Sequence, residues 1–173
     1  AVLKKEAKFE IDPMEVGDEA ILKHLSRIRE KGLQGENVMD VTCSVVYAAN
    51  RKLFLSEHRD LDESHMWTNA AVGAIGARGE ELKNSYKSYS LLGGAELLKE
   101  VEGDVDHVIR NLNDLLTSEP MVPGEYDCVC DPEVTGMIVH EAFGHGVEMD
   151  MFVKDRAQAQ QFIGQYMASP LVT

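Results

Sequence analysis

The sequence lacks a basic balance, a long apolar run and an even set of cysteines, and each absence argues against a class of protein. Its 173 residues carry 17 Lys and Arg against 30 Asp and Glu, for a formal net charge of −13. A nucleic-acid-binding surface needs basic patches that displace counterions, so we expect no direct binding of DNA or RNA. No apolar stretch approaches the length that spans a bilayer, and residues 1–10 show no signal peptide, so we expect no membrane partner.

The 3 cysteines are an odd set, which argues against a disulfide framework and fits the reducing cytoplasm. Cys128 and Cys130 are separated by one residue in an alternating, strand-like run. Such a spacing is poor for two ligands of one ion, so we interpret both as small apolar side chains. With 44% apolar residues, the chain has the composition of an ordinary globular protein.

Apolar periodicity predicts the first helix. Residues 1–13 are charged and are expected to form a loosely held arm or a short helix. Asp18 is a good N-cap for the helix that follows, which ends at Gly32. The apolar residues of this helix recur at helical spacing; they are Ile21, Leu22, Leu25 and Ile28. His24 lies beside this stripe and is expected at the protein surface or at the boundary of the core.

A strand-rich block comes next. Apolar and polar side chains alternate in its first part, as they do in a strand with one buried face. We expect strands at 39–49, 53–58, 64–78 and 82–91. Residues 50–52 form the predicted first turn, and His58 and His65 are expected in a solvated loop. Together the strands predict an antiparallel meander.

A second amphipathic helix follows Gly93 and Gly94 and should cover the sheet. Asp104 is its expected N-cap, and its apolar stripe consists of Val105, Val108, Ile109, Leu112, Leu115 and Leu116. Residues 118–124 contain two prolines and are interpreted as a linker. The predicted fold class is α+β, an antiparallel β-meander covered by amphipathic helices. Residues 1–117 are expected to form this sheet-plus-helix domain, as part of a longer N-terminal domain, and a metal-motif helix is expected to follow it.

Residues 125–173 form the metal-motif segment, which is expected to open with a short strand at 125–131. An Asp-Pro-Glu sequence at 131–133 is a strong helix start, with an N-cap, a proline at the first position and an acid near the positive end of the dipole. Residues 154–161 favour a short helix. Pro170 is expected to end the last ordered piece.

The helix that starts at this segment carries His140, Glu141 and His145, a His-Glu-x-x-x-His arrangement. Two neutral imidazoles can share a zinc ion, and a glutamate beside them can take a proton from water. The familiar zinc-peptidase motif has two residues, not three, between the Glu and the second His. The pattern indicates a metal site. The alternative is that the three side chains only cap or decorate a helix end.

The extra residue changes the geometry. On a regular α-helix, residues four apart lie about 40° apart around the axis, and residues five apart about 140°. Glu141 and His145 would then share a face that excludes His140. The glycines on either side of His145 make a distortion cheap. We therefore predict an irregular helix at 143–146, with a π-type turn or a helix stop.

Residues 136–150 resemble the TldD/PmbA family, which is known as a modulator of DNA gyrase. The segment is similar to the TldD type, which carries the His-Glu-x-x-x-His motif, and not to the PmbA type, which lacks it. The resemblance extends to the tail at 163–173 and, more loosely, back to about Asp18. Departures at Met149 and 151–155 leave the substrate preference open.

The resemblance implies a cytoplasmic zinc-dependent peptidase that acts on unfolded or extended peptides. His140 and His145 would be the zinc ligands and Glu141 the general base. The family's third ligand is a cysteine of a later, C-terminal domain, for which Glu148 or Asp150 would be oxygen-donating substitutes. A catalytic zinc takes three protein ligands, so we expect this chain to be an incomplete fragment that lacks the C-terminal domain and is inactive alone.

The resemblance also implies assembly into a homodimer, or into a heterodimer with a motif-less relative, around an enclosed chamber. A rival hypothesis is a non-catalytic partner or scaffold subunit that modulates another enzyme such as DNA gyrase. In that case the histidine pair is a relic or a structural site.

Overall fold

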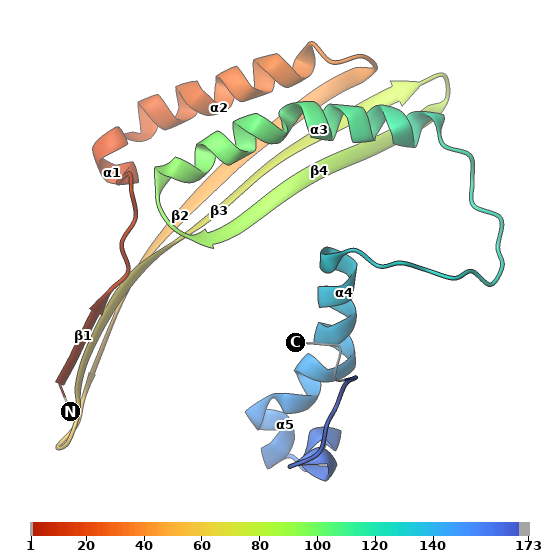
Figure 1. The fold of residues 1–173 in the computed structure, drawn as a ribbon. Helices are drawn as coiled ribbons and strands as arrows, with labels where there is room; N and C mark the ends of the chain where they lie inside the picture. The colour runs from red at the N-terminus through yellow and green to blue at the C-terminus, as the bar shows by residue number, and fades with distance from the viewer. Residues whose placement is uncertain (1, 170–173) are drawn as a thin grey trace. The chain divides into compact units, whose positions relative to one another are not determined.

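The chain folds as two units, Ala1–Pro120 and Met121–Thr173, in a computed structural model that describes residues 2–169, the side chain of Gln158 excepted. The first unit contains β1 (Val2–Glu6), α1 (Pro13–Val16), α2 (Asp18–Leu33), β2 (Val38–Leu55), β3 (Asp60–Arg78), β4 (Glu81–Leu92), η1 (Ala95–Leu97) and α3 (Leu98–Thr117). The second contains α4 (Pro132–Val139), η2 (His140–Gly144), η3 (His145–Val147), α5 (Met149–Val153) and η4 (Gln158–Phe162) (Figure 1). The predicted α+β class is confirmed. Pro170 lies outside the described residues.

Strand β3 is the central strand of a four-stranded sheet. Strand β2 pairs antiparallel with one edge of β3, from Val38 opposite Gly76 to Leu55 opposite Asp60. The other edge of β3 is shared, because β1 pairs parallel with its first part and β4 antiparallel with the rest. Strands β2, β3 and β4 therefore form the predicted meander, to which β1 adds a parallel pairing.

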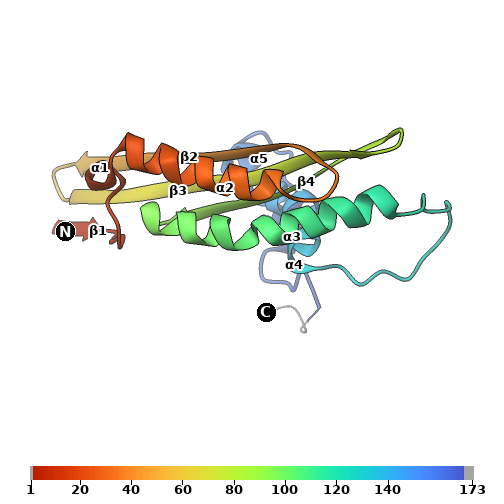
Figure 2. The same ribbon diagram turned by 90° about the horizontal axis from the view of Figure 1, so that it is seen from above.

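Helices α2 and α3 lie side by side on one face of the sheet, as Figures 1 and 2 show from two directions. The side chains between the helices and the sheet form the core; those at most 2% exposed include Ile28, Val41, Val72, Val101, Val105, Val108 and Leu112. Gly32 lies within α2, where a Cβ would approach Val41 Cγ2 to 3.0 Å. The prediction that amphipathic helices cover the sheet is confirmed.

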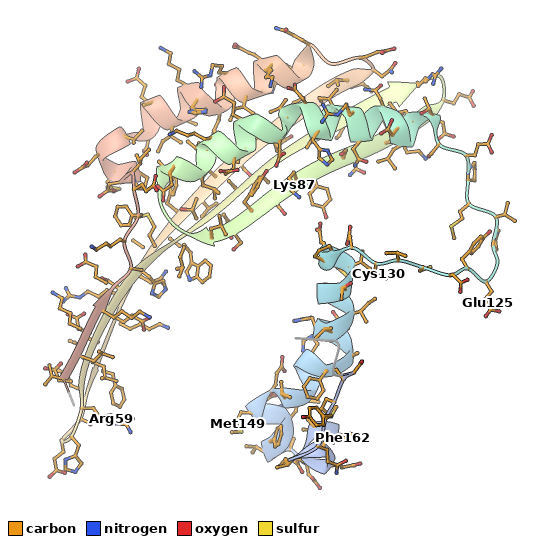
Figure 3. All side chains as sticks on the ribbon, in the orientation of Figure 1. Arg59, Lys87, Glu125, Cys130, Met149 and Phe162 are labelled. Atoms are coloured by element: carbon orange, nitrogen blue, oxygen red, sulfur yellow. The ribbon has the colours of Figure 1, made fainter. Side chains whose placement is uncertain are left out.

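The predicted turn at 50–52 is wrong. Strand β2 continues to Leu55, and the chain reverses at 56–59, with Arg59 at the end of the hairpin (Figure 3). Polar residues are tolerated in this part of β2 because they form contacts with residues of the neighbouring strand β3. Arg51 donates to Asp62 of β3 through Nε at 3.0 Å and Nη2 at 2.8 Å.

Two further expectations for this end of the sheet need correction. Residues 2–6 form strand β1, where an arm or a short helix was expected, because the long hairpin offers them an edge of β3. His65 lies on β3 and not in a loop, and its ring meets the ring of Trp67 edge-on at 6.5 Å.

Helix boundaries also differ from the predictions. Helix α2 has Gly17 as its N-cap, so Asp18 is its first residue, and the helix continues past Gly32 to Leu33. Helix α3 begins at Leu98 after the 3₁₀ turn η1, well before the expected cap at Asp104. Asp104 instead accepts a hydrogen bond from the Tyr89 hydroxyl of β4.

The predicted strand at 125–131 is wrong, because this segment pairs with no strand among the described residues. Cys128 and Cys130 are exposed there and pack in no core. The short helix expected at 154–161 is replaced by the 3₁₀ turn η4, after α5 has ended at Val153. Within the described part of the chain, no helix combines the length and apolar character needed to cross a bilayer.

Candidate metal centre

Helix α4 begins as the sequence predicts. Asp131 has extended backbone angles and is the N-cap, and its Oδ1 accepts a hydrogen bond of 2.8 Å from the Val134 N–H. Pro132 fills the first helical position and Glu133 adds negative charge to the first turn, near the positive end of the helix dipole. The cap fixes where the helix starts and therefore where along it the motif falls.

The motif itself lies in a widened turn. Residues His140–Gly144 form the π-helical turn η2, in which the His145 N–H donates to the His140 carbonyl oxygen. The 3₁₀ turn η3 then closes the helix at Val147, and Glu148 returns to extended backbone. The predicted π-type irregularity is confirmed, although it starts three residues earlier than expected. A π turn bonds residues five apart, so it stacks residues that a regular α-helix would separate.

The widened turn brings the three motif side chains together. The ring centroids of His140 and His145 are 4.5 Å apart, with 70° between the ring planes. One ligand atom from each of His140, Glu141 and His145 can be chosen so that all lie within 4.8 Å of one another. The Glu141 Oε2 lies 3.8 Å from the His145 Nε2. Two imidazoles and one carboxylate therefore converge on a common point.

This donor set fits a borderline divalent cation such as zinc. Ligand nitrogens about 2.0–2.1 Å from a tetrahedral zinc lie about 3.4 Å from each other, so the ligand atoms here, which lie within 4.8 Å of one another, would have to move closer together to bind it. All three side chains are exposed, so no buried core packing opposes small rotations of them. His140 and His145 can hold the ion, and Glu141 stands beside the pair.

Glu148 and Asp150, which the sequence offers as substitute ligands, are engaged elsewhere. The Glu148 Oε1 lies 2.8 Å from the His145 Nδ1, on the opposite edge of the ring from Nε2. Asp150 accepts a hydrogen bond of 3.0 Å from Lys154 Nζ. Sequence reasoning missed the Glu148–His145 contact, for which the spacing of three residues on a helical turn was a usable signal.

Comparison with known proteins agrees with this geometry. Residues 123–173 match the family model of the PmbA/TldA metallopeptidase C-terminal domain. A protein of Methanothermobacter thermautotrophicus named as a metalloprotease is 29% identical over 143 residues, which is 80% of this chain and 31% of the relative. A protein of the same name from Archaeoglobus fulgidus is 27% identical over 138 residues, covering 77% of this chain and 32% of that relative.

A metalloprotease of Methanocaldococcus jannaschii is 32% identical over a shorter stretch of 59 residues, which is 34% of this chain and 13% of the relative. The chain spans about a third of the length of the two relatives that it matches over most of its own length. The family match falls on the segment that contains the widened turn and its three side chains. Residues 123–173 are therefore similar to the PmbA/TldA metallopeptidase C-terminal domain, and most of the chain is similar to about a third of two proteins named as metalloproteases.

Proposed function

We propose that this chain is part of a zinc-dependent peptidase that hydrolyses unfolded or extended peptides in the cytoplasm. The observation that carries the proposal is the π-helical turn, which brings His140, Glu141 and His145 within 4.8 Å of one another. His140 and His145 are the proposed zinc ligands. Because a catalytic zinc takes three protein ligands, the third comes from outside this chain, and the chain alone is inactive.

Glu141 is the proposed general base. When bound, zinc supplies Lewis-acid polarisation of a peptide carbonyl and makes water more acidic. The Glu141 carboxylate lies beside the imidazole pair, so it can accept the proton of an attacking water and then deliver it to the leaving amine. The side chain is 67% exposed, which leaves room for water and substrate next to it.

An extended peptide suits this site because the three side chains stand on the exposed surface of a helical turn of the second unit. A folded substrate would present few main-chain carbonyls to such a turn. The free thiols of Cys43, Cys128 and Cys130 support a reducing compartment such as the cytoplasm.

Elemental analysis and peptide cleavage test the proposal on full-length protein, in which the proposed third ligand would be present. Glu141→Gln should keep its zinc and lose about 10²–10⁴-fold of the cleavage rate, since it removes only the proton acceptor. His145→Ala should lose the zinc. Glu133→Gln, on the first turn of the same helix, is the matched control and should keep both.

Cleavage at an unchanged rate by Glu141→Gln, or a wild-type protein without zinc, would overturn the proposal. A non-catalytic scaffold that modulates an enzyme such as DNA gyrase predicts a third result, in which the wild-type protein cleaves no peptide. The same preparations would then be assayed for their effect on gyrase supercoiling.

We also propose that the protein works as a homodimer, or as a heterodimer with a relative that lacks the motif. Exposed apolar side chains on the second unit support an assembly that covers them; they include Met137, Val139, Met149 and Val153. Light scattering after size exclusion, on the full-length protein alone and mixed with such a relative, tests this. A monomer in both samples would contradict it.

A further inference from the structure

Glu148 is held at one edge of the His145 ring by its own backbone. The Glu148 N–H donates to the His145 carbonyl oxygen at 3.4 Å. The Glu148 carbonyl oxygen in turn accepts from the N–H groups of Met151 and Phe152, at 3.1 and 3.3 Å, in the first turn of α5. The residue is therefore fixed between η3 and α5, and its side chain is directed back at the imidazole.

The resulting hydrogen bond selects one form of the imidazole. The Glu148 Oε1 is 2.8 Å from the His145 Nδ1, and an ionised carboxylate can only accept a hydrogen bond. The proton of a neutral His145 ring therefore sits on Nδ1, which leaves the lone pair on Nε2 free. The Glu141 Oε2 is 3.8 Å from Nε2, so the free lone pair lies on the edge of the ring next to Glu141.

We propose that Glu148 is a positioning residue, which holds the His145 ring in the tautomer and orientation in which Nε2 can bind the metal. This inference rests on the proposed function, because it assigns Glu148 a role toward the same zinc ion. A ligand histidine commonly donates its other N–H to a carboxylate, which fixes the ring and raises its basicity as a ligand. In this proposal Glu148 does not bind the metal itself but forms a hydrogen bond with His145, which does.

Three variants of the full-length protein separate this role from others. Glu148→Ala removes the hydrogen-bond acceptor for His145 Nδ1. Glu148→Gln keeps an amide oxygen in nearly the same place, so it should retain most of the wild-type tautomer preference and zinc affinity. Asp150→Asn alters a carboxylate two residues away that bonds to Lys154, and it serves as the control. Zinc affinity is measured by competition with a chelator, and the tautomer by ¹⁵N NMR of the histidine side chains in metal-free protein.

We expect His145 to be protonated on Nδ1 in the wild type, in Glu148→Gln and in the control, and to shift toward the Nε2-protonated form in Glu148→Ala. Zinc affinity should fall by about 10–100-fold in Glu148→Ala and clearly less in Glu148→Gln. The absorption spectrum of the cobalt(II)-loaded Ala variant should keep the wild-type bands, because no ligand has been lost. A Glu148 that binds the metal directly would change those bands and overturn the inference.

An unchanged tautomer and unchanged zinc affinity in Glu148→Ala would also overturn it, while leaving the proposed peptidase intact. A wild-type protein that binds no zinc would instead overturn the proposed function, and the inference with it. Thermal unfolding shows whether the Glu148→Ala variant is still folded. If it is not, the Glu148→Gln variant tests the proposal, because a shifted His145 tautomer in a folded Gln variant contradicts it.

Discussion

In the first unit, Ala1–Pro120, the side chains that hold the structure are shielded from solvent, whereas in the second, Met121–Thr173, the side chains of the motif are exposed. Ile28, Val101 and Leu112 have no exposed surface at all. Among the described residues of the second unit, only Ala157 and Ala159 are buried. The first unit therefore obtains its geometry from burial, and the second obtains that of its motif from the path of the backbone and a few hydrogen bonds.

Two glutamates make the same contrast. Glu96, at the start of the α3 region, accepts hydrogen bonds from the backbone N–H groups of Gly94, Ile11 and Glu10 at 2.8, 3.0 and 3.3 Å. It ties a segment near the N-terminus to the end of the sheet. Glu141 is exposed and faces an imidazole. The first carboxylate is committed to the fold, and the second remains available for proton transfer.

The largest expected effect comes from Leu112→Ala, which should damage the first unit and spare the second. Leu112 is fully buried against the sheet, so its truncation should lower the free energy of unfolding by about 2–5 kcal/mol. Leu115→Ala, on a half-exposed position of the same helix, should cost clearly less. Urea unfolding measures both. If zinc affinity falls along with the stability in Leu112→Ala, the two units are coupled and the contrast between them is wrong.

Glu96→Gln should have the next largest effect, and that effect should depend on pH. Burial by itself raises the pKa of Glu96, but the hydrogen bonds from backbone N–H groups outweigh it and bring the pKa below its ordinary 4.5. The folded state therefore releases this proton at a lower pH than the unfolded state does. The added stability is fully present above pH 4.5 and is lost as the pH falls through the lower, folded pKa.

At neutral pH the Glu96→Gln variant should be less stable by about 1–3 kcal/mol, since a charged acceptor is lost. Unfolding of wild type and variant between pH 7 and pH 3 should show this difference shrinking at the acid end. A difference that stays constant over this range would mean that the carboxylate charge contributes nothing.

A smaller effect, of opposite sign, is expected for Gly103→Ala. Gly103 lies inside α3, and a Cβ there would meet no atom within 4 Å. Alanine should stabilise the first unit by about 0.5–1 kcal/mol, because it restricts the unfolded chain and favours the helix. Gly76→Ala is the matched control, since its Cβ would lie 2.4 Å from the Asn37 carbonyl oxygen. Differential scanning calorimetry should show a higher unfolding temperature for Gly103→Ala and a lower one for Gly76→Ala than for the wild type.

The smallest expected effect comes from deleting Ala142 in the second unit. The deletion leaves a His-Glu-x-x-His spacing, which places both imidazoles on one face of a regular α-helix. Zinc affinity of the full-length protein should therefore stay within about tenfold of wild type. Inserting one alanine after Ala142 is the contrasting variant and should abolish zinc binding. Equal losses in the two variants would show that the π-helical turn is needed for more than the approach of the histidines.

The sequence alone was sufficient where one local rule decides the structure. The spacing of Val105, Val108 and Leu112 predicted which side of α3 is buried, and the five-residue step from His140 to His145 required a distorted helix. The Asp131 cap was predictable for the same reason, because side chain and backbone N–H are three residues apart.

Features that depend on distant partners were missed. The polar run at 50–52 resembles a turn until Arg51 is seen to pair with Asp62 across the hairpin. Strand β1 exists because β4 leaves part of the β3 edge uncovered. The alternating run at 125–131 has the pattern of a strand but finds no partner strand within the described residues. The role that we propose for Glu148 could not be predicted from the sequence, because it depends on the orientation of the His145 ring.

The π-helical turn also affects everything that follows it in the chain. An extra residue in a regular α-helix rotates all later side chains by about 100° about the axis. A single widened turn takes up that residue locally, so the helix downstream keeps its facing. Loss of one residue at 142–143, together with loss of the widened turn, would therefore shorten the motif while both histidines stay on one face of the helix. Searches that require one fixed interval between two histidines will overlook sites of this kind.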